Sequence, residues 1–129
     1  MKSIVGTWRL VETRAKNDAG EACDAPYGPE PMGTVWFSAN GRMQSVLCDG
    51  RAKLPDDATE REYNSYCGNY TFDGQQLITR VDAASDPRRL GTDQVRGVAF
   101  DGERVILTPP PQPWGGVMQH RELVWQRIG

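Results

Sequence analysis

The chain has 129 residues, which is the length of one domain and too short to divide into two hydrophobic cores. Its formal net charge is −2, and its 15 lysines and arginines are dispersed, so nucleic acid and anionic membranes are not expected as partners. One domain over residues 1–129 is therefore expected from the length. No apolar run has the length of a signal peptide or of a membrane span, so neither is expected.

Eight strands are expected in chain order, separated by turn dipeptides. Asn-Gly at 40–41 and Asp-Gly at 49–50, 73–74 and 101–102 accept positive φ and stand between segments rich in β-branched and aromatic residues. The expected strands cover residues 4–14, 33–39, 42–48, 67–73, 75–83, 92–100, 103–109 and 119–127. This regular spacing is typical of all-β barrels and sandwiches.

Two segments depart from the strand pattern. Residues 55–66 contain a capping-box pattern and place Tyr63 and Tyr66 on one helical face, which predicts a short helix at one end of the fold. The prolines of residues 108–117 remove backbone donors from any ladder, so this segment cannot be a central strand. We expect a loop at the rim there.

The Asp-Gly turns predict which side chains point inward, because a two-residue turn sets the register of its hairpin. The turn at 101–102 places Val98, Val105 and Leu107 on one face, and their apolar character marks this face as the interior. Gln94 and Arg96 lie on the same face and are therefore expected inside as well. The inward residues expected from the two hairpins are Gln94, Arg96, Val98, Val105 and Leu107, and Tyr70, Leu77, Thr79 and Val81.

The hairpin at Asn40-Gly41 allows two assignments. Trp36 and Met43 share one face with Ser45 and Leu47, whereas the other face carries Val35, Phe37, Gln44 and Val46. The first face is preferred as the interior, because a large indole and a flexible thioether suit the wall of a cavity.

Polar residues recur at the expected inward positions of other strands. Glu12 shares a face with Trp8 and Leu10, and Arg121 shares a face with Leu123 and Trp125. Buried polar groups need partners, so these residues form either an internal salt-bridged network or the lining of a hydrated ligand pocket.

Five blocks in the same order resemble the bacterial and fungal lipocalin-like domain family. The blocks are IVGTWRLVE (4–12), YGPEPMGTVWFSANGRM (27–43), YCGNYTFDG (66–74), GTDQVRGVAFDGERVILTPP (91–110) and ELVWQR (122–127). The resemblance implies an eight-stranded antiparallel up-and-down β-barrel, to which the short helix would add a lid at one end. It also implies that Trp8 packs against Arg127 at the closed end. Where many relatives carry a histidine, this chain has Thr79 and Arg80, so imidazole chemistry at that strand is not expected.

Arg96 is the residue expected to hold a ligand oxygen with paired donors, the alternative being an internal pair with Glu12. Tyr70 either donates to the ligand, acts as a general acid, or has its hydroxyl satisfied by the backbone. Trp114 is expected in the apolar wall, and His120 points outward at the rim. The expected ligand-binding residues are Trp36, Met43, Tyr70, Thr79, Gln94, Arg96 and Arg121.

The preferred function is binding of a small, mostly apolar organic molecule with an anionic or carbonyl oxygen inside the barrel. One alternative is a cofactor-independent isomerase, cyclase or lyase with Arg96, Tyr70 and Glu12 as catalytic residues. Another is a structural or interaction module with a filled barrel. No nucleotide, metal or serine-nucleophile motif is present, so no cofactor and no metal is expected.

The three cysteines, Cys23, Cys48 and Cys67, are odd in number and widely spaced. This pattern argues against a disulfide framework and against a paired-thiol metal site. A reducing cytoplasm is the expected location. The oligomeric state stays open between a monomer and a homodimer.

Overall fold

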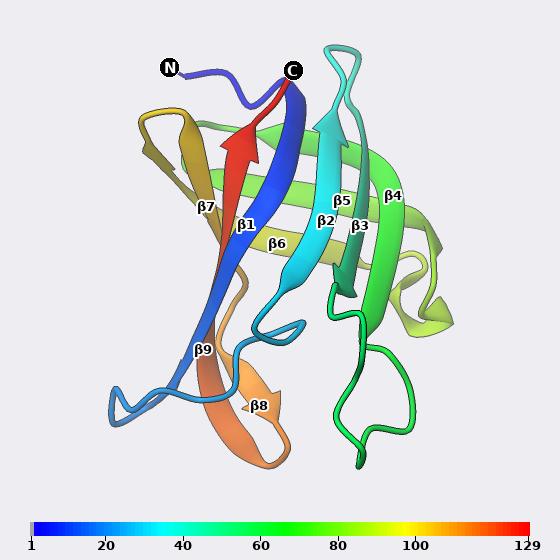
Figure 1. Cartoon of the computed structure of the whole chain (residues 1–129). Helices are drawn as coiled ribbons and strands as arrows, with labels where there is room; N and C mark the ends of the chain where they lie inside the picture. Colours follow the sequence, from blue (N-terminus) through cyan, green and yellow to red (C-terminus); the bar gives the residue numbers. More distant parts are fainter. Residues whose placement is uncertain (1) are drawn as a thin grey trace.

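In the computed structural model, which describes residues 2–129, nine strands form one antiparallel sheet. The strands are β1 (Gly6–Asn17), β2 (Pro31–Phe37), β3 (Arg42–Asp49), β4 (Tyr63–Phe72), β5 (Gln76–Ala84), β6 (Asp93–Asp101), β7 (Arg104–Thr108), β8 (Gln112–Trp114) and β9 (Val117–Arg127). Consecutive strands are neighbours as far as β7, β9 follows β7, and β9 also pairs with β1 (Figure 1). This last pairing closes an eight-stranded barrel, which confirms the expected fold class, and β8 is an additional strand.

The predicted helix over residues 55–66 is wrong. Tyr63 and Tyr66 belong to β4, which pairs with β3, and inter-strand hydrogen bonds therefore replace those of a two-turn helix that is unstable alone. The helical element of residues 2–129 is a 3₁₀ turn, η1 (Pro87–Arg89), between β5 and β6. The described residues contain no helix with the length and apolar character of a membrane span.

The proline-rich segment contains a short strand as well as the expected loop. Gln112–Trp114 forms β8, which pairs with the beginning of β9 outside the barrel. Pro113 is tolerated because β8 is an edge strand, where a missing backbone donor breaks no ladder. The expectation that this segment is not a central strand is therefore correct.

Trp8 closes one end of the barrel, as the resemblance implied. Its side chain is 1% exposed, and its indole Nε1 donates to the Ile4 carbonyl at 2.9 Å. The guanidinium carbon of Arg127 lies 4.2 Å from the indole centroid, and the same group donates to the carbonyls of Val5 and Ser3 at 2.7 and 2.8 Å. Cation–π attraction and these hydrogen bonds attach the N-terminal segment to the closed end.

Both Asp-Gly hairpins have the predicted faces with a shifted register. Phe72 pairs with Leu77 and Phe100 with Val105, so each turn lies one residue later than expected. Gly74 and Gly102 have φ of 100° and 59° at the first central position of their turns. A one-residue move of the turn changes the pairing by two residues, which preserves the faces.

The expected inward position of Trp36 is wrong. Ser38 donates its N–H to the Arg42 carbonyl at 2.8 Å, so three residues rather than two form the loop. The extra residue pairs Phe37 with Met43 and leaves Trp36 45% exposed on the outer wall. Met43 is buried as expected, together with Phe37 and Val35.

The expected inward position of Glu12 is also wrong. A bulge between Leu10 and Glu12 shifts the pairing of β1 with β9, so Thr13 and Ala15 point inward instead. Glu12 is exposed and pairs with Arg14 at 2.9 Å. The proposed internal pair between Glu12 and Arg96 is therefore absent.

Candidate functional site

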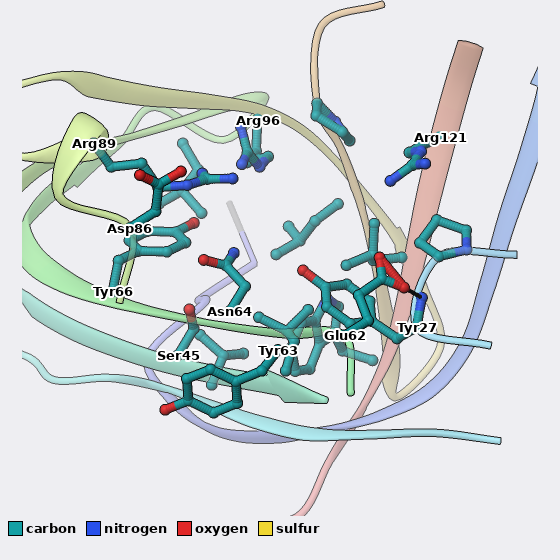
Figure 2. Close-up of a pocket in the computed structure, with 18 of the residues that line it drawn as sticks. Tyr27, Ser45, Glu62, Tyr63, Asn64, Tyr66, Asp86, Arg89, Arg96 and Arg121 are labelled. Atoms are coloured by element: carbon teal, nitrogen blue, oxygen red, sulfur yellow. Dashed lines mark hydrogen bonds between the residues drawn. The ribbon is translucent and has the colours of Figure 1, made fainter. Parts of the chain in front are cut away.

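A cavity of about 260 Å³ lies in the barrel on the side away from Trp8. Its floor and walls are apolar residues of the strands, and its mouth is formed by the connections β1–β2, β3–β4, β5–β6 and β7–β9. The apolar residues are Val35, Phe37, Met43, Leu47, Leu77, Leu107, Leu123 and Trp125. Figure 2 shows the polar side chains around the mouth.

Tyr27 joins two of the connections at the mouth. Its φ of 63° is the one positive value among non-glycine residues 2–129, and its backbone N–H donates to Glu62 Oε1 at 2.6 Å (Figure 2). Burial raises the pKa of the Tyr27 phenol, and a hydrogen bond with Asn64 partly opposes this rise. A costly backbone conformation held by a carboxylate is typical of residues positioned for binding.

A buried carboxylate supports the β3–β4 connection at the rim. Asp49 is buried and pairs with Arg51 at 2.6 Å, and Arg61 donates to the carbonyls of Asp49 and Arg51 at 2.7 and 2.6 Å. The hydrogen bonds from Arg51 hold the pKa of the Asp49 carboxyl below its ordinary value. These contacts order a connection that has no secondary structure of its own.

Two arginines share one glutamine beside the cavity. Arg96 donates to the Val95 carbonyl at 2.8 Å and to Gln94 Oε1 at 3.2 Å, and Arg89 donates to the same Gln94 oxygen. Arg89 also lies over the Tyr66 ring, 5.7 Å from its centroid. Figure 2 shows Arg89 and Arg96 close together above Tyr66 and Asn64.

A third arginine lies on another side of the mouth. The guanidinium carbon of Arg121 is 3.7 Å from the Trp114 ring centroid, and its Nε donates to Gln119 Oε1 at 3.3 Å. Burial lowers the pKa of Arg121, although an arginine stays protonated at neutral pH. Trp114 lines the cavity as expected.

Arg89, Arg96 and Arg121 form no ion pair with any carboxylate of residues 2–129. The acidic residues of the lining are Glu62, which accepts from Tyr27, and Asp86, which pairs with Arg88 at 2.9 Å. The cavity therefore combines an apolar interior with a mouth that presents three guanidinium groups bound to neutral partners. Such groups can bind carboxylate, phenolate or enolate oxygens with paired donors.

The expected site residues of this paragraph divide into three groups. Met43, Arg96 and Arg121 line the cavity. Thr79 is buried opposite Gln94 in the sheet, and both are outside the lining, although Gln94 orients the arginines. Trp36 and Glu12 lie on the outer wall.

Tyr70 lies near the closed end rather than along the cavity. Its hydroxyl donates to the Ser38 carbonyl at 2.7 Å, and burial raises the pKa of its phenol. Of the three roles expected for the Tyr70 hydroxyl, a hydrogen bond to the backbone is therefore the one that the structure shows. His120 lies at the rim, where its Nε2 is 2.8 Å from Asp18 Oδ1.

Several residues of the mouth have no counterpart among the expected site residues. They are Tyr27, Glu62, Asn64, Tyr66, Asp86 and Arg89. The predicted helix over residues 55–66 gives Asn64 and Tyr66 no place in a strand. In the structure both residues alternate with Gly68 and Tyr70 on the inward face of β4, and this period of two is also present in the sequence. The others lie in connections, where periodicity carries no signal.

Comparison with known proteins supports the resemblance. A family model described as a lipocalin-like domain matches residues 5–128. No curated protein and no solved structure matches the chain. The family match therefore covers nearly all of the barrel, including the cavity and its mouth.

Proposed function

Because the chain belongs to the lipocalin-like domain family, whose barrel suits ligand binding in general, we propose that its cavity binds a small, mostly apolar organic molecule. The ligand carries an anionic or carbonyl oxygen that Arg96 holds at the mouth. The apolar part of the ligand lies against the strand residues beneath.

The observation that carries this proposal is the set of three guanidinium groups without carboxylate partners. Arg96 and Arg121 are partly buried, and a charge withdrawn from water needs compensation from a counter-charge or hydrogen bonds. Their present partners, Gln94, Gln119 and a backbone carbonyl, are neutral. Burial lowers the pKa of Arg121, and the Glu62 carboxylate opposes this only from a distance, so an oxyanion of the ligand supplies the direct counter-charge.

The size and lining of the cavity support a compact apolar body. An apolar cavity of about 150 Å³ binds benzene, so a cavity of about 260 Å³ suits a somewhat larger body, such as two fused rings. Tyr66, Trp114 and Leu123, which are partly exposed in the lining, supply aromatic and aliphatic surface for such a body.

Binding is preferred over catalysis because the expected proton-transfer groups lie elsewhere. Glu12 is on the outer wall, and the Tyr70 hydroxyl is hydrogen-bonded near the closed end. An enzyme that used Arg96 to stabilise an oxyanion also needs a group that transfers a proton. The carboxylates of the mouth, Glu62 and Asp86, are engaged by the Tyr27 N–H and by Arg88 at 2.9 Å.

Titration with 2-naphthoic acid tests the proposal. We expect Arg96→Gln to weaken binding at least about tenfold, which corresponds to the loss of one charge-assisted interaction, as measured by calorimetry. Arg80→Gln is the matched control, because Arg80 is an exposed arginine on the outer wall that pairs with Asp93 at 3.0 Å. We expect the control to bind like the wild type.

Two results would contradict the proposal. One is the absence of naphthoate binding by the wild type, and the other is equal affinity in the wild type and Arg96→Gln. Methyl 2-naphthoate, which keeps a carbonyl oxygen but lacks the anion, should bind more weakly to the wild type, and Arg96→Gln should weaken its binding less than that of naphthoate. Naphthoate has no group for an isomerase, cyclase or lyase to change, so incubation with a series of carbonyl compounds, followed by analysis for product, distinguishes a binding protein from an enzyme.

A further inference from the structure

The two arginines on one side of the mouth, Arg89 and Arg96, converge on a single oxygen atom. Arg96 Nη2 donates to Gln94 Oε1 at 3.2 Å, and Arg89 Nη1 donates to the same oxygen. Both arginines line the cavity and are half-buried, so part of each side chain is open to a ligand in the mouth (Figure 2). Two guanidinium groups are thus held close together at one place of the site.

The orientation of the Gln94 side chain is fixed from both ends of its amide. Its Nε2 donates to the Thr92 hydroxyl at 3.1 Å, and this hydroxyl donates to the Arg89 carbonyl at 2.6 Å. A guanidinium only donates, so the amide oxygen must face the two arginines. Gln94 is therefore a positioning residue, because it sets the spacing of the two guanidinium groups without supplying a charge.

Two positive charges remain at this pair of arginines. Like charges held close together repel each other, and the glutamine oxygen between them is neutral. Asp86 lies beside Arg89 (Figure 2), but this carboxylate is paired with Arg88 at 2.9 Å. The hydrogen bonds from Arg88 hold the pKa of the Asp86 carboxyl below its ordinary value, and Arg89 adds only a charge effect without a hydrogen bond. Arg88 therefore neutralises Asp86.

We infer that the ligand carries a doubly charged acidic group, of the phosphate monoester class, which Arg89 and Arg96 bind together. The inference rests on the proposed function and adds the charge of the ligand's acid and a second residue that binds it, Arg89. A ligand carbonyl would only replace the neutral oxygen of Gln94. A singly charged carboxylate would compensate one of the two guanidinium groups, whereas a dianion compensates both.

Both guanidinium groups keep donors for such a ligand. Arg89 Nε and Nη2 and Arg96 Nε donate to no acceptor of residues 2–129. A phosphate monoester presents three terminal oxygens, which are strong acceptors, and a carboxylate presents two. The tetrahedral group can therefore accept from two guanidinium groups that approach it from different directions.

Two naphthyl esters that differ in charge test the inference. 2-Naphthyl phosphate and 2-naphthyl sulfate have the same ring and a tetrahedral acid group. The second pKa of a phosphate monoester is about 6, so at about pH 8 the phosphate carries two charges and the sulfate one. Calorimetry measures both affinities. We expect the wild type to bind the phosphate about tenfold more tightly than the sulfate, because one further charge-assisted interaction forms.

Two variants lower the positive charge of the pair in different ways. Arg89→Gln removes one guanidinium, and Gln94→Glu places a carboxylate between the two. We expect either variant to reduce the ratio of the two affinities to about twofold or less, while the sulfate still binds. Arg80→Gln and Gln75→Glu are matched controls, because both residues are exposed and lie outside the lining, and they should keep the wild-type ratio.

The stability of ligand-free Gln94→Glu is a second measurement, which needs no ligand. The new carboxylate loses the hydrogen bond to Thr92 but accepts a charge-assisted hydrogen bond from each arginine. We therefore expect this variant to melt no lower than the wild type. A clearly lower melting temperature would show that the two charges are already compensated, and it would overturn the inference.

Failure of the inference is distinguishable from failure of the proposed function. Equal binding of the two esters by the wild type, or a ratio that Arg89→Gln leaves unchanged, overturns the inference. The proposed function still stands in that case if Arg96→Gln weakens the binding of 2-naphthoic acid. Binding of 2-naphthoic acid but of neither ester also overturns the inference alone. The absence of binding by all three compounds overturns both.

Discussion

Trp36 and Phe37 are adjacent residues of β2 that lie on opposite faces of the barrel wall. Phe37 is fully buried, lines the cavity and packs edge-on against the Tyr70 ring, with centroids 5.1 Å apart. Trp36 is on the outer face, paired in register with Thr7 and Gln44. At the scale of one residue, the loop length of a single hairpin decides which aromatic side chain is buried inside the barrel and which one faces solvent.

Substitution of these two residues tests the assignment. We expect Phe37→Ala to lower the free energy of unfolding by about 3–5 kcal/mol, because it removes a fully buried ring. Trp36→Thr should change it by about 0.5 kcal/mol or less, since the side chain is half exposed and threonine suits a strand. Urea unfolding measures both values. A larger loss in Trp36→Thr than in Phe37→Ala would reverse the assignment of faces.

At the scale of the element, the β3–β4 connection is ordered by charges rather than by backbone pairing. Asp49 is buried at the end of β3, where it pairs with Arg51 and its carbonyl accepts from Arg61. Glu62 at the other end of the connection accepts from the Tyr27 N–H. These contacts position Glu62 and Asn64 at the cavity mouth, so stability of the connection and shape of the site are coupled.

The pKa of Asp49 predicts how this support depends on pH. Because the pKa is lowered in the folded protein, its contribution to stability is complete above the unfolded value of about 3.9 and is lost as pH falls through the lowered value. Asp49→Asn should therefore be less stable than the wild type near neutral pH, and the difference should shrink in acid. Urea unfolding between about pH 6 and 2 measures it.

Asp57→Asn is the control for this series, because Asp57 is exposed in the same connection. It should follow the wild type at every pH. A difference between Asp49→Asn and the wild type that stays constant down to strong acid would show that the carboxylate charge does not support the connection.

At the scale of the whole molecule, the barrel has two unlike ends (Figure 1). The end with both termini is closed by Trp8, Arg127 and the N-terminal segment, including the buried Ile4. The other end carries the connections that contain Tyr27, Glu62, Arg89 and Trp114, all of which line the cavity. A ligand must therefore enter between these connections.

Hydrogen exchange with bound 2-naphthoic acid tests this polarity. We expect the backbone amides of residues 24–30, 50–62, 85–92 and 109–116 to exchange more slowly when the acid is bound, because the ligand orders the mouth. Amides around Trp8 and Arg127 should change little, since a folded barrel already protects them. Protection centred on the closed end would place the binding site elsewhere.

The sequence by itself determined the strands of the barrel except for the first part of β4, most of the turns and the closed end. Strand alternation and the positive φ of turn glycines are local properties, so the faces of the β4–β5 and β6–β7 hairpins followed from them even where the register differed by two residues. The inward positions of Arg96 and Arg121 followed from the same alternation, whereas that of Met43 was preferred for the softness of its side chain in a hairpin that allowed two assignments. The Trp8–Arg127 contact came from the family resemblance.

Only the tertiary structure decided which polar residues meet at the cavity. The bulge in β1 and the three-residue loop before β3 each add one residue, and one residue exchanges the two faces of a strand, which moved Glu12 and Trp36 outside. Tyr27, Glu62 and Arg89 come from separate connections that barrel closure brings together. Ser45 Oγ and Trp125 Nε1 are buried without a hydrogen-bond partner among residues 2–129, and this too depends on which residues surround them in space. A periodic pattern in the sequence contains information only on neighbours along the chain.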